Sequence, residues 1–214
     1  MINDEYKIKE ESFKKLKLGS FLNILNVFVA IVLGTIVAYA VLSMVFSAVS
    51  HNIPPGSIGK YILIKIYSDI YLVILFFAVY ILLASIEVYS IYLYSKSVSL
   101  LSAFNDNLKD VAKFTKYLYL VFIGTDGAAI LEILINFIFI KNIPIFIIYV
   151  ILVTVEFFLS LYLFIGIYRI GVIYNSSTLR LGTIFYFIPF LNLVAPFLLY
   201  SGSKKLIAEN KDRL

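Results

Sequence analysis

The sequence has no cysteine, tryptophan or glutamine, only one histidine, and few charged residues, which make up 14% of its 214 positions. Without cysteine, disulfide bonds and thiolate metal sites are excluded, and His51 alone cannot build a histidine-rich metal or haem site. We therefore expect no metal and no cofactor. The lack of cysteine and glutamine beside abundant lysine is typical of thermophilic proteins, although an AT-rich genome would produce the same bias.

Apolar residues are correspondingly abundant, at 62% of the chain, and the mean hydropathy is +0.97. Soluble domains contain about 45–50% apolar and about 25% charged residues. A soluble chain cannot bury this much apolar surface, so the composition predicts an integral membrane protein. The formal net charge of +5 does not indicate nucleic-acid binding, because most of the excess lysines lie beside hydrophobic stretches, where they contact lipid headgroups.

The hydrophobic stretches predict an all-α transmembrane bundle that forms a single membrane domain of about five spans. A helix of about 20 apolar residues crosses the hydrocarbon core of a bilayer. We expect the spans at residues 21–49, 70–94, 117–140, 145–168 and 181–200.

The fifth span is interrupted by Pro189 and Pro196, which leaves two topologies open. The density of lysine and arginine predicts a cytoplasmic N-terminus in the cell membrane. Five full spans then put the basic tail, residues 201–214, outside. A re-entrant hairpin bending at Pro189–Asn192 would return the tail to the cytoplasm, provided that protein or water shields its backbone. We favour five spans, because the early loops mostly set the orientation.

Two charged segments carry apolar residues at helical spacing. Residues 4–19 contain Tyr6, Phe13 and Leu16, and residues 95–116 contain Val98, Leu101, Leu108 and Val111 near one helical face. Amphipathic helices of this kind lie on membrane surfaces. We expect both segments to form interfacial helices.

Small residues recur every fourth position in the first span, at Ala30, Gly34 and Ala38. Such a face lets another helix approach closely. We expect it to pack against a helix of the same chain or of a second copy.

Four acidic residues lie inside the expected spans: Glu87, Asp126, Glu132 and Glu156. Acids within a bilayer are costly and are candidates for function. Arg169, at the cytoplasmic end of the fourth span, is a potential partner of Glu87. The tight turn Lys141–Pro144 makes the third and fourth spans antiparallel neighbours, which would bring Glu132 and Glu156 to similar depths.

Two interpretations of these acids remain open. They can form a proton or cation pathway, or they can be fixed, protonated hydrogen-bond donors between helices, with Glu87 paired to Arg169. A carrier needs a polar site that several acids share, whereas a scaffold can scatter them into separate pairs. No nucleotide loop, nucleophile motif or metal-ligand cluster is present, so we expect no catalytic residues and no enzyme activity. The favoured function is an accessory or scaffold subunit with a second copy or a membrane complex as partner; the alternative is a small proton-coupled transporter or channel.

The C-terminal region resembles part of a known family. Its residues run from Tyr168-Arg169-Ile170-Gly171 through Leu181-Gly182-Thr183 and Pro189-Phe190-Leu191-Asn192 to Gly202-Ser203-Lys204-Lys205. This pattern resembles the C-terminal signature of an uncharacterised multi-span membrane family of thermoacidophilic archaea, the domain of unknown function 973. The resemblance implies an archaeal, thermophilic membrane protein and implies no activity.

Overall fold

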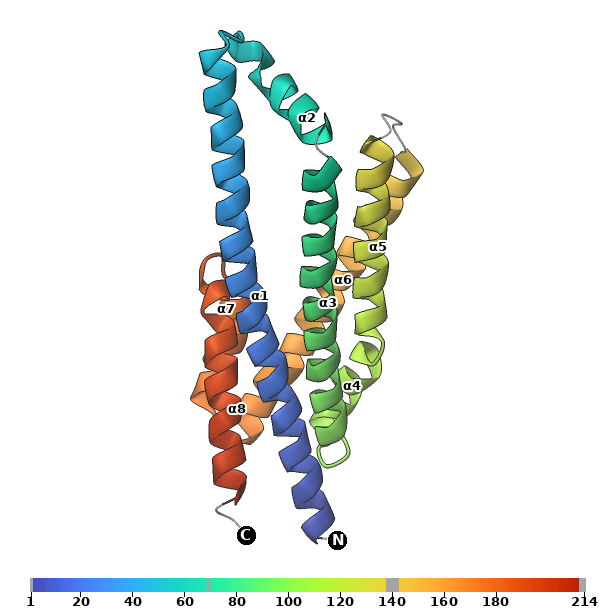
Figure 1. The fold of residues 1–214 in the computed structure, drawn as a ribbon. Helices are drawn as coiled ribbons and strands as arrows, with labels where there is room; N and C mark the ends of the chain where they lie inside the picture. The colour runs from blue at the N-terminus through green and yellow to red at the C-terminus, as the bar shows by residue number, and fades with distance from the viewer. Residues whose placement is uncertain (1, 69, 138–142, 212–214) are drawn as a thin grey trace. The chain divides into compact units, whose positions relative to one another are not determined.

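The computed structural model describes residues 2–68, 70–137 and 143–211, which form helices joined by short turns, with no strand among them. The longer helices, drawn in Figure 1, are α1 (Ile2–Ser50), α2 (Ile58–Ser68), α3 (Ile70–Leu101), α4 (Lys109–Thr115), α5 (Leu118–Phe137), α6 (Ile143–Ile173), α7 (Ser177–Tyr186) and α8 (Ala195–Lys211). Three short 3-10 helices accompany them: η1 (Pro55–Ser57), η2 (Asp106–Leu108) and η3 (Leu191–Leu193).

The chain divides into two compact units, the first made of residues 1–24 and 86–214 and the second of residues 25–85. The boundaries fall inside α1 and α3, so each of these helices contributes to both units. In the second unit, the hydroxyls of Ser47 and Tyr61 lie 3.3 Å apart and join the end of α1 to α2. The four acids predicted to lie in the membrane all belong to the first unit.

Four helical stretches are long and apolar enough to cross a membrane: Glu5–Ser50, Val73–Leu101, Asp106–Ile135 and Pro144–Ile173. At most 22% of the most apolar window in any of them is buried within the protein. Many of the other apolar side chains, such as Phe28 and Phe158, are exposed, which suits contact with lipid tails. The all-α membrane architecture predicted from composition is therefore supported, with four candidate spans among the described residues.

The fifth apolar stretch, residues 181–200, is divided between two helices, at the place where the sequence predicted an interruption. Helix α7 ends at Tyr186, and α8 begins at Ala195. Between them Phe190 adopts a left-handed backbone with φ of 65°. Proline has no amide hydrogen, and Pro189 stands at this break, where a helix cannot continue. Pro196, in the first turn of α8, is tolerated because the first amides of a helix have no internal partner.

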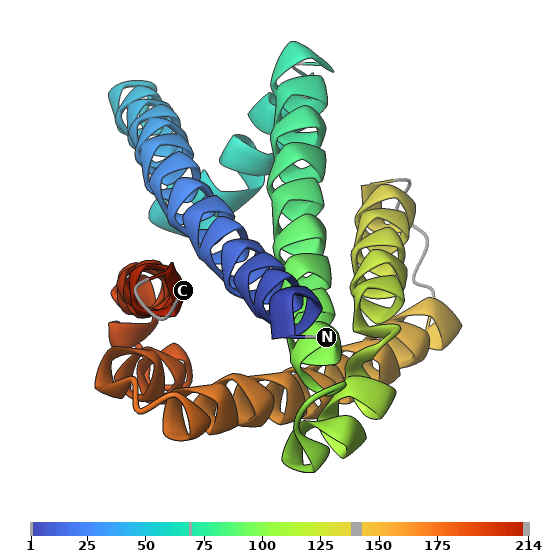
Figure 2. The ribbon, with the colours of Figure 1, turned by 90° about the horizontal axis from the view of Figure 1, so that it is seen from below.

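After the break, α8 returns along α7, so residues 187–194 form the bend of a helical hairpin. A Cβ atom added to Gly182 would lie 3.0 Å from Leu198 Cβ, which shows how closely the two helices approach. Helix α7 also packs along the C-terminal part of α6, where a Cβ on Gly171 would lie 3.1 Å from the backbone nitrogen of Arg180. Figure 2 shows the hairpin beside the end of α6. The bend falls where the sequence left a hairpin open as an alternative.

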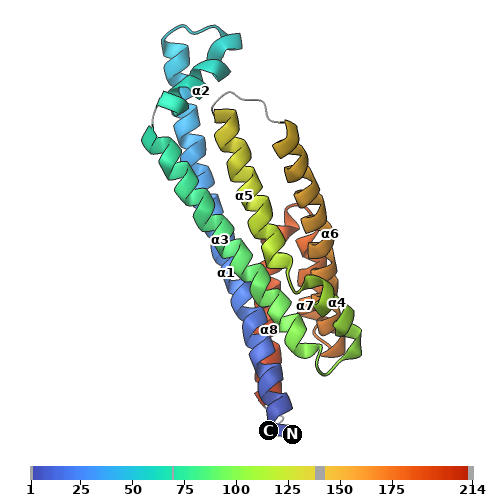
Figure 3. The same cartoon turned by 90° about the vertical axis from the view of Figure 1, so that its right-hand side faces the viewer.

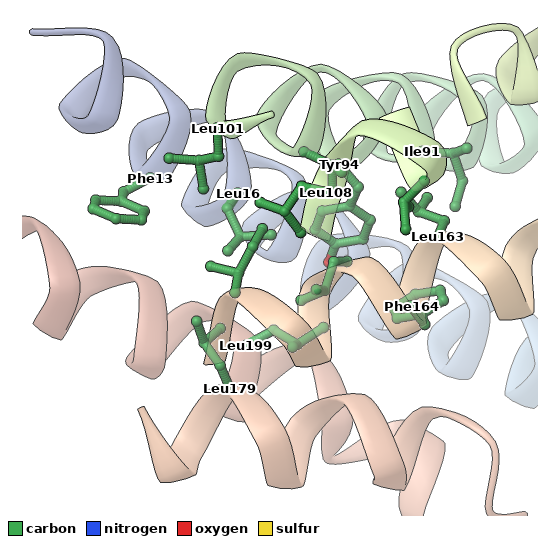
Figure 4. Packing of buried hydrophobic residues seen from close by; sticks show 14 of the residues in the cluster. Phe13, Leu16, Ile91, Tyr94, Leu101, Leu108, Leu163, Phe164, Leu179 and Leu199 are labelled. Carbon is green, nitrogen blue, oxygen red and sulfur yellow. The ribbon is translucent and has the colours of Figure 1, made fainter. Parts of the chain in front are cut away.

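The two predicted amphipathic segments have the expected apolar faces but different surroundings. Residues 4–19 are the first part of the continuous helix α1, and Phe13 and Leu16 are buried in the core of the first unit. Residues 95–116 are not one helix, because α3 extends to Leu101 and η2 and α4 follow. Their apolar residues, Val98, Leu101, Leu108 and Val111, are buried in the same core, drawn in Figure 4. Helical spacing shows which face is apolar but not whether protein or lipid covers it.

Helices α1 and α3 are joined in the first unit by hydroxyl and amide groups. Ser12 Oγ donates to the Ser97 carbonyl at 2.9 Å, and Ser90 Oγ donates to the Gly19 carbonyl at 2.8 Å. The buried Tyr94 hydroxyl donates to Ser20 Oγ at 3.2 Å and accepts from Asn23 Nδ2 at 3.2 Å. These bonds satisfy polar groups that would be costly to bury unpaired.

The close approach of α1 to another helix occurs at Gly19 rather than at Gly34. A Cβ on Gly19 would lie 2.9 Å from Tyr94 Cε1, whereas a Cβ on Gly34 would meet nothing within 4 Å. Ala30, Gly34 and Ala38 are all exposed. Their expected packing against another helix stays a prediction.

Candidate functional site: a carboxyl cluster

Three of the four predicted intramembrane acids meet in the first unit. Glu87 on α3 interacts electrostatically with Asp126 on α5 and with Glu156 on α6. Glu156 in turn interacts with Asp126. We call Glu87, Asp126 and Glu156 the carboxyl cluster; its members are half-buried and come from three different helices.

The position of Glu156 follows from the packing of α5 beside α6, which run next to each other in Figure 3. Its carboxyl group hydrogen-bonds the side chain of Thr125, the residue before Asp126. The Thr125 hydroxyl is buried and lies 3.0 Å from the Val121 carbonyl oxygen, to which it donates. A hydroxyl has a single proton to donate. While Thr125 donates to Val121, its bond to Glu156 requires the proton to be on the carboxyl group.

This arrangement gives Glu156 two hydrogen-bonded states. When the carboxyl is protonated, it donates to the Thr125 hydroxyl, which donates to Val121. When the carboxyl is ionised, rotation of the Thr125 hydroxyl lets it donate to the carboxylate instead, and the Val121 carbonyl keeps its helical bond. A proton can therefore be taken up or released without leaving the carboxyl group unpaired.

One tyrosine borders the cluster, and sequence analysis missed it. Tyr186, the last residue of α7, interacts electrostatically with Glu87, Glu156 and Tyr94. Its ring stacks on Phe164 of α6, with centroids 3.8 Å apart and an interplanar angle of 25°. The signal available in the sequence was that Tyr186 directly precedes the break in the fifth apolar stretch.

Glu132 lies on α5, six residues beyond Asp126, which is about 9 Å along the helix and about 120° around it. Its Oε2 atom is buried. The contacts that locate Glu156 run instead through Thr125 and Asp126. The expected pairing of Glu132 with Glu156 stays a prediction, and part of the turn on which it rested, Lys141 and Asn142, lies outside the described residues.

Arg169 lies away from the cluster. It is 13 residues beyond Glu156 on α6, about 20 Å along the helix axis. Its Nη1 donates to the Asn107 carbonyl at 2.7 Å and so holds η2 against α6. The potential pairing of Arg169 with Glu87 stays a prediction.

The chemistry of the cluster is that of carboxyl and hydroxyl groups. Within the described parts of the chain, no three His, Cys, Asp or Glu side chains are arranged to hold a metal ion. Neighbouring carboxyls in a poorly hydrated site disfavour one another's ionisation, so a shared proton stabilises them. The geometry therefore suits the binding of a proton.

The comparisons with known proteins place the chain in a family without an assigned activity. A family model described as "Protein of unknown function (DUF973)" matches residues 10–213, so the chain belongs to this family. The resemblance predicted from the C-terminal residues is confirmed and extends over nearly the whole chain. A search of curated proteins and one of solved structures each find no match.

Proposed function

We propose that this member of the DUF973 family is a small proton-coupled carrier or channel, in which the carboxyl cluster takes up and releases a proton. The observation that carries the proposal is the hydrogen bond of Glu156 to Thr125, because Thr125 can serve both protonation states. Glu87 and Asp126 supply further carboxyls on neighbouring helices. The proposed activity is not enzymatic and uses no cofactor.

The convergence of the acids favours this function over a purely structural one. A scaffold needs its buried acids only as separate partners of nearby donors. Here three acids from α3, α5 and α6 lie within electrostatic reach of one another, and the end of α7 adds Tyr186. Placing several carboxyl groups close together lowers the stability of the fold. A role in proton transfer would explain why the protein has this arrangement.

The proposed topology has four spans and a re-entrant hairpin, with the N-terminus in the cytoplasm. Helix α7 has 10 residues and so reaches about 15 Å, half of a hydrocarbon core of about 30 Å. Support comes from its end, Tyr186, which reaches the carboxyl cluster, and from the basic residues. The start of α1 and the end of α8 lie at the same end of the first unit (Figures 1 and 3). With four spans the basic tail joins the other lysine clusters in the cytoplasm, as the positive-inside rule requires.

The composition and the predicted family resemblance further support a thermophilic archaeal source and residence in the cell membrane. The bilayer itself is then the first partner of the chain. We infer no nucleic-acid partner.

Proton flux into liposomes tests the proposed function. Purified protein is reconstituted, a potassium diffusion potential is imposed, and the internal pH is followed with a trapped dye. Glu156→Gln should abolish protein-dependent flux, because an amide keeps hydrogen bonding but cannot exchange a proton. Thr125→Val should reduce flux by about tenfold or more, since a hydrogen bond to a charged group contributes about 1.5–3 kcal/mol. Thr125→Ser keeps the hydroxyl and should retain the flux.

Two matched controls separate proton transfer from general damage. Glu209→Gln removes an exposed acid of α8, and Thr154→Val removes an exposed α6 hydroxyl that donates to the carbonyl four residues earlier, as Thr125 does. Both should leave flux unchanged. Equal flux through the wild type and Glu156→Gln would contradict the proposal.

A scaffold function remains the second candidate, favoured by the exposed face of Ala30, Gly34 and Ala38. A Cβ on Gly34 would meet nothing within 4 Å, so this face is open to a second copy or to a membrane partner. A scaffold protein would show no protein-dependent flux, and association through this face would be lost in Gly34→Leu.

A further inference from the structure

A groove lies between the N-terminal part of α1 and helix α8, both in the first unit. Its volume is about 480 Å³, and it is lined by Lys14, Lys17, Leu18, Phe21, Tyr200 and Ile207. This volume is within the range of about 300–1,000 Å³ found for small-molecule sites. The lining combines two cations with an apolar wall, so we call it the lysine groove.

The two lysines of the groove are held by different neighbours. Lys17 Nζ lies 5.4 Å from the centroid of the Tyr200 ring, a cation–π contact. Lys14 Nζ lies 2.8 Å from Glu10 Oε1, and the Lys14 side chain is 61% exposed. The Glu10 side chain is only 17% exposed, and an ammonium group has three N–H donors, so Lys14 can bind an anion while it stays paired with Glu10.

The lysine groove stands where the charged part of α1 ends. After Lys17 the chain contains no charged residue until Lys60. On α8, Tyr200 precedes the polar run that contains Lys204 and Lys205. In a membrane this level is the interface, where headgroups meet acyl chains and where tyrosine rings gather. The cations of the groove are therefore at headgroup depth.

The apolar wall continues from the cations toward the uncharged part of α1. Leu18 and Phe21 are 44% and 49% exposed, and the rings of Phe21 and Tyr200 have centroids 6.5 Å apart. A soluble anion would use only the lysines. An anionic lipid would place its phosphate at the lysines and the first carbons of its hydrocarbon chain along Leu18 and Phe21.

We propose that the lysine groove binds one anionic phospholipid, with the phosphate between Lys14 and Lys17 and a hydrocarbon chain against Phe21. Basic pockets between membrane helices bind anionic headgroups by this chemistry. The site lies on α1 and α8, apart from the carboxyl cluster, and its existence does not depend on proton transfer.

Native mass spectrometry of the full chain tests the lipid site, with phosphatidylglycerol titrated against phosphatidylcholine and inorganic phosphate. The wild type should retain one phosphatidylglycerol in preference to phosphatidylcholine. Its affinity should fall about fivefold for Lys14→Gln or Lys17→Gln and about thirtyfold for both together, since each lysine contributes about 1 kcal/mol near an anionic surface. Glu10→Gln should strengthen binding, because it frees Lys14 from its ion pair.

The matched control is the double variant Lys113→Gln with Lys116→Gln. It also removes two positive charges, one within α4 and one just after its last residue. Lys116 also lies over an aromatic ring, that of Tyr117, at 5.1 Å. This double variant should bind the lipid as the wild type does. The proposal is overturned if both double variants lose affinity equally, if inorganic phosphate competes the lipid away, or if Glu10→Gln weakens binding as Lys14→Gln does, which would make the ion pair structural.

Discussion

At the scale of single residues, the packing of the first unit depends on glycines that the sequence does not distinguish from others. Gly19, Gly166 and Gly202 each leave less than 3.0 Å between an added Cβ and a neighbouring side-chain atom. The predicted face at Gly34 had the regular spacing that pattern analysis recognises. Close contact depends instead on which helix lies opposite, and a single sequence does not contain that information.

A matched pair of substitutions on α1 compares the packing roles of Gly19 and Gly34. Gly19→Leu should lower thermal stability in detergent by the equivalent of about 1–3 kcal/mol or more, because the side chain meets Tyr94 and the Ser90 carbonyl. Gly34→Leu should leave the stability unchanged, since its position is open. A light-scattering measurement of the same samples reports oligomer size. Equal stability of the two variants would refute the assignment of Gly19 as the packing residue.

At the scale of elements, the sequence predicted the apolar faces of residues 4–19 and 95–116 but not their environment. Phe13 and Val111 are buried in protein, although their spacing equally suits a membrane surface. The fifth stretch left its topology open for a related reason. Its 20 residues are enough to span a bilayer, and Pro189 marked an interruption without revealing that α8 turns back along α7.

The hairpin predicts where the C-terminal tail lies, and single cysteines in this cysteine-free chain can locate it. Membrane-impermeant maleimide applied to intact cells should label Ser57→Cys and should leave Ala103→Cys and Lys204→Cys unlabelled until the membrane is opened. All three positions are exposed in the structure, so lack of labelling reports the side of the membrane. Labelling of Lys204→Cys together with Ser57→Cys would restore the five-span topology.

At the scale of the whole molecule, the described residues expose many large apolar side chains, and acids from three helices meet in the carboxyl cluster. The sequence identified all three acids of the carboxyl cluster, because acids inside apolar stretches are conspicuous. It did not predict their grouping. Depth along a helix can be counted from a turn, but Asp126 and Glu132 differ by about 120° around α5, and only the packing of α5 against α6 decides which of them faces Glu156.

The central claim, that these carboxyls act as one proton-binding site, is tested most directly by infrared titration of the reconstituted protein. The carbonyl stretch of the protonated Glu156 carboxyl is identified by its loss in Glu156→Gln, and its intensity is followed with pH. In Glu87→Gln the midpoint of this titration should move, because the two carboxyls interact, whereas Glu209→Gln should leave it unchanged. A Glu156 titration that is identical in the wild type and in Glu87→Gln would contradict the account.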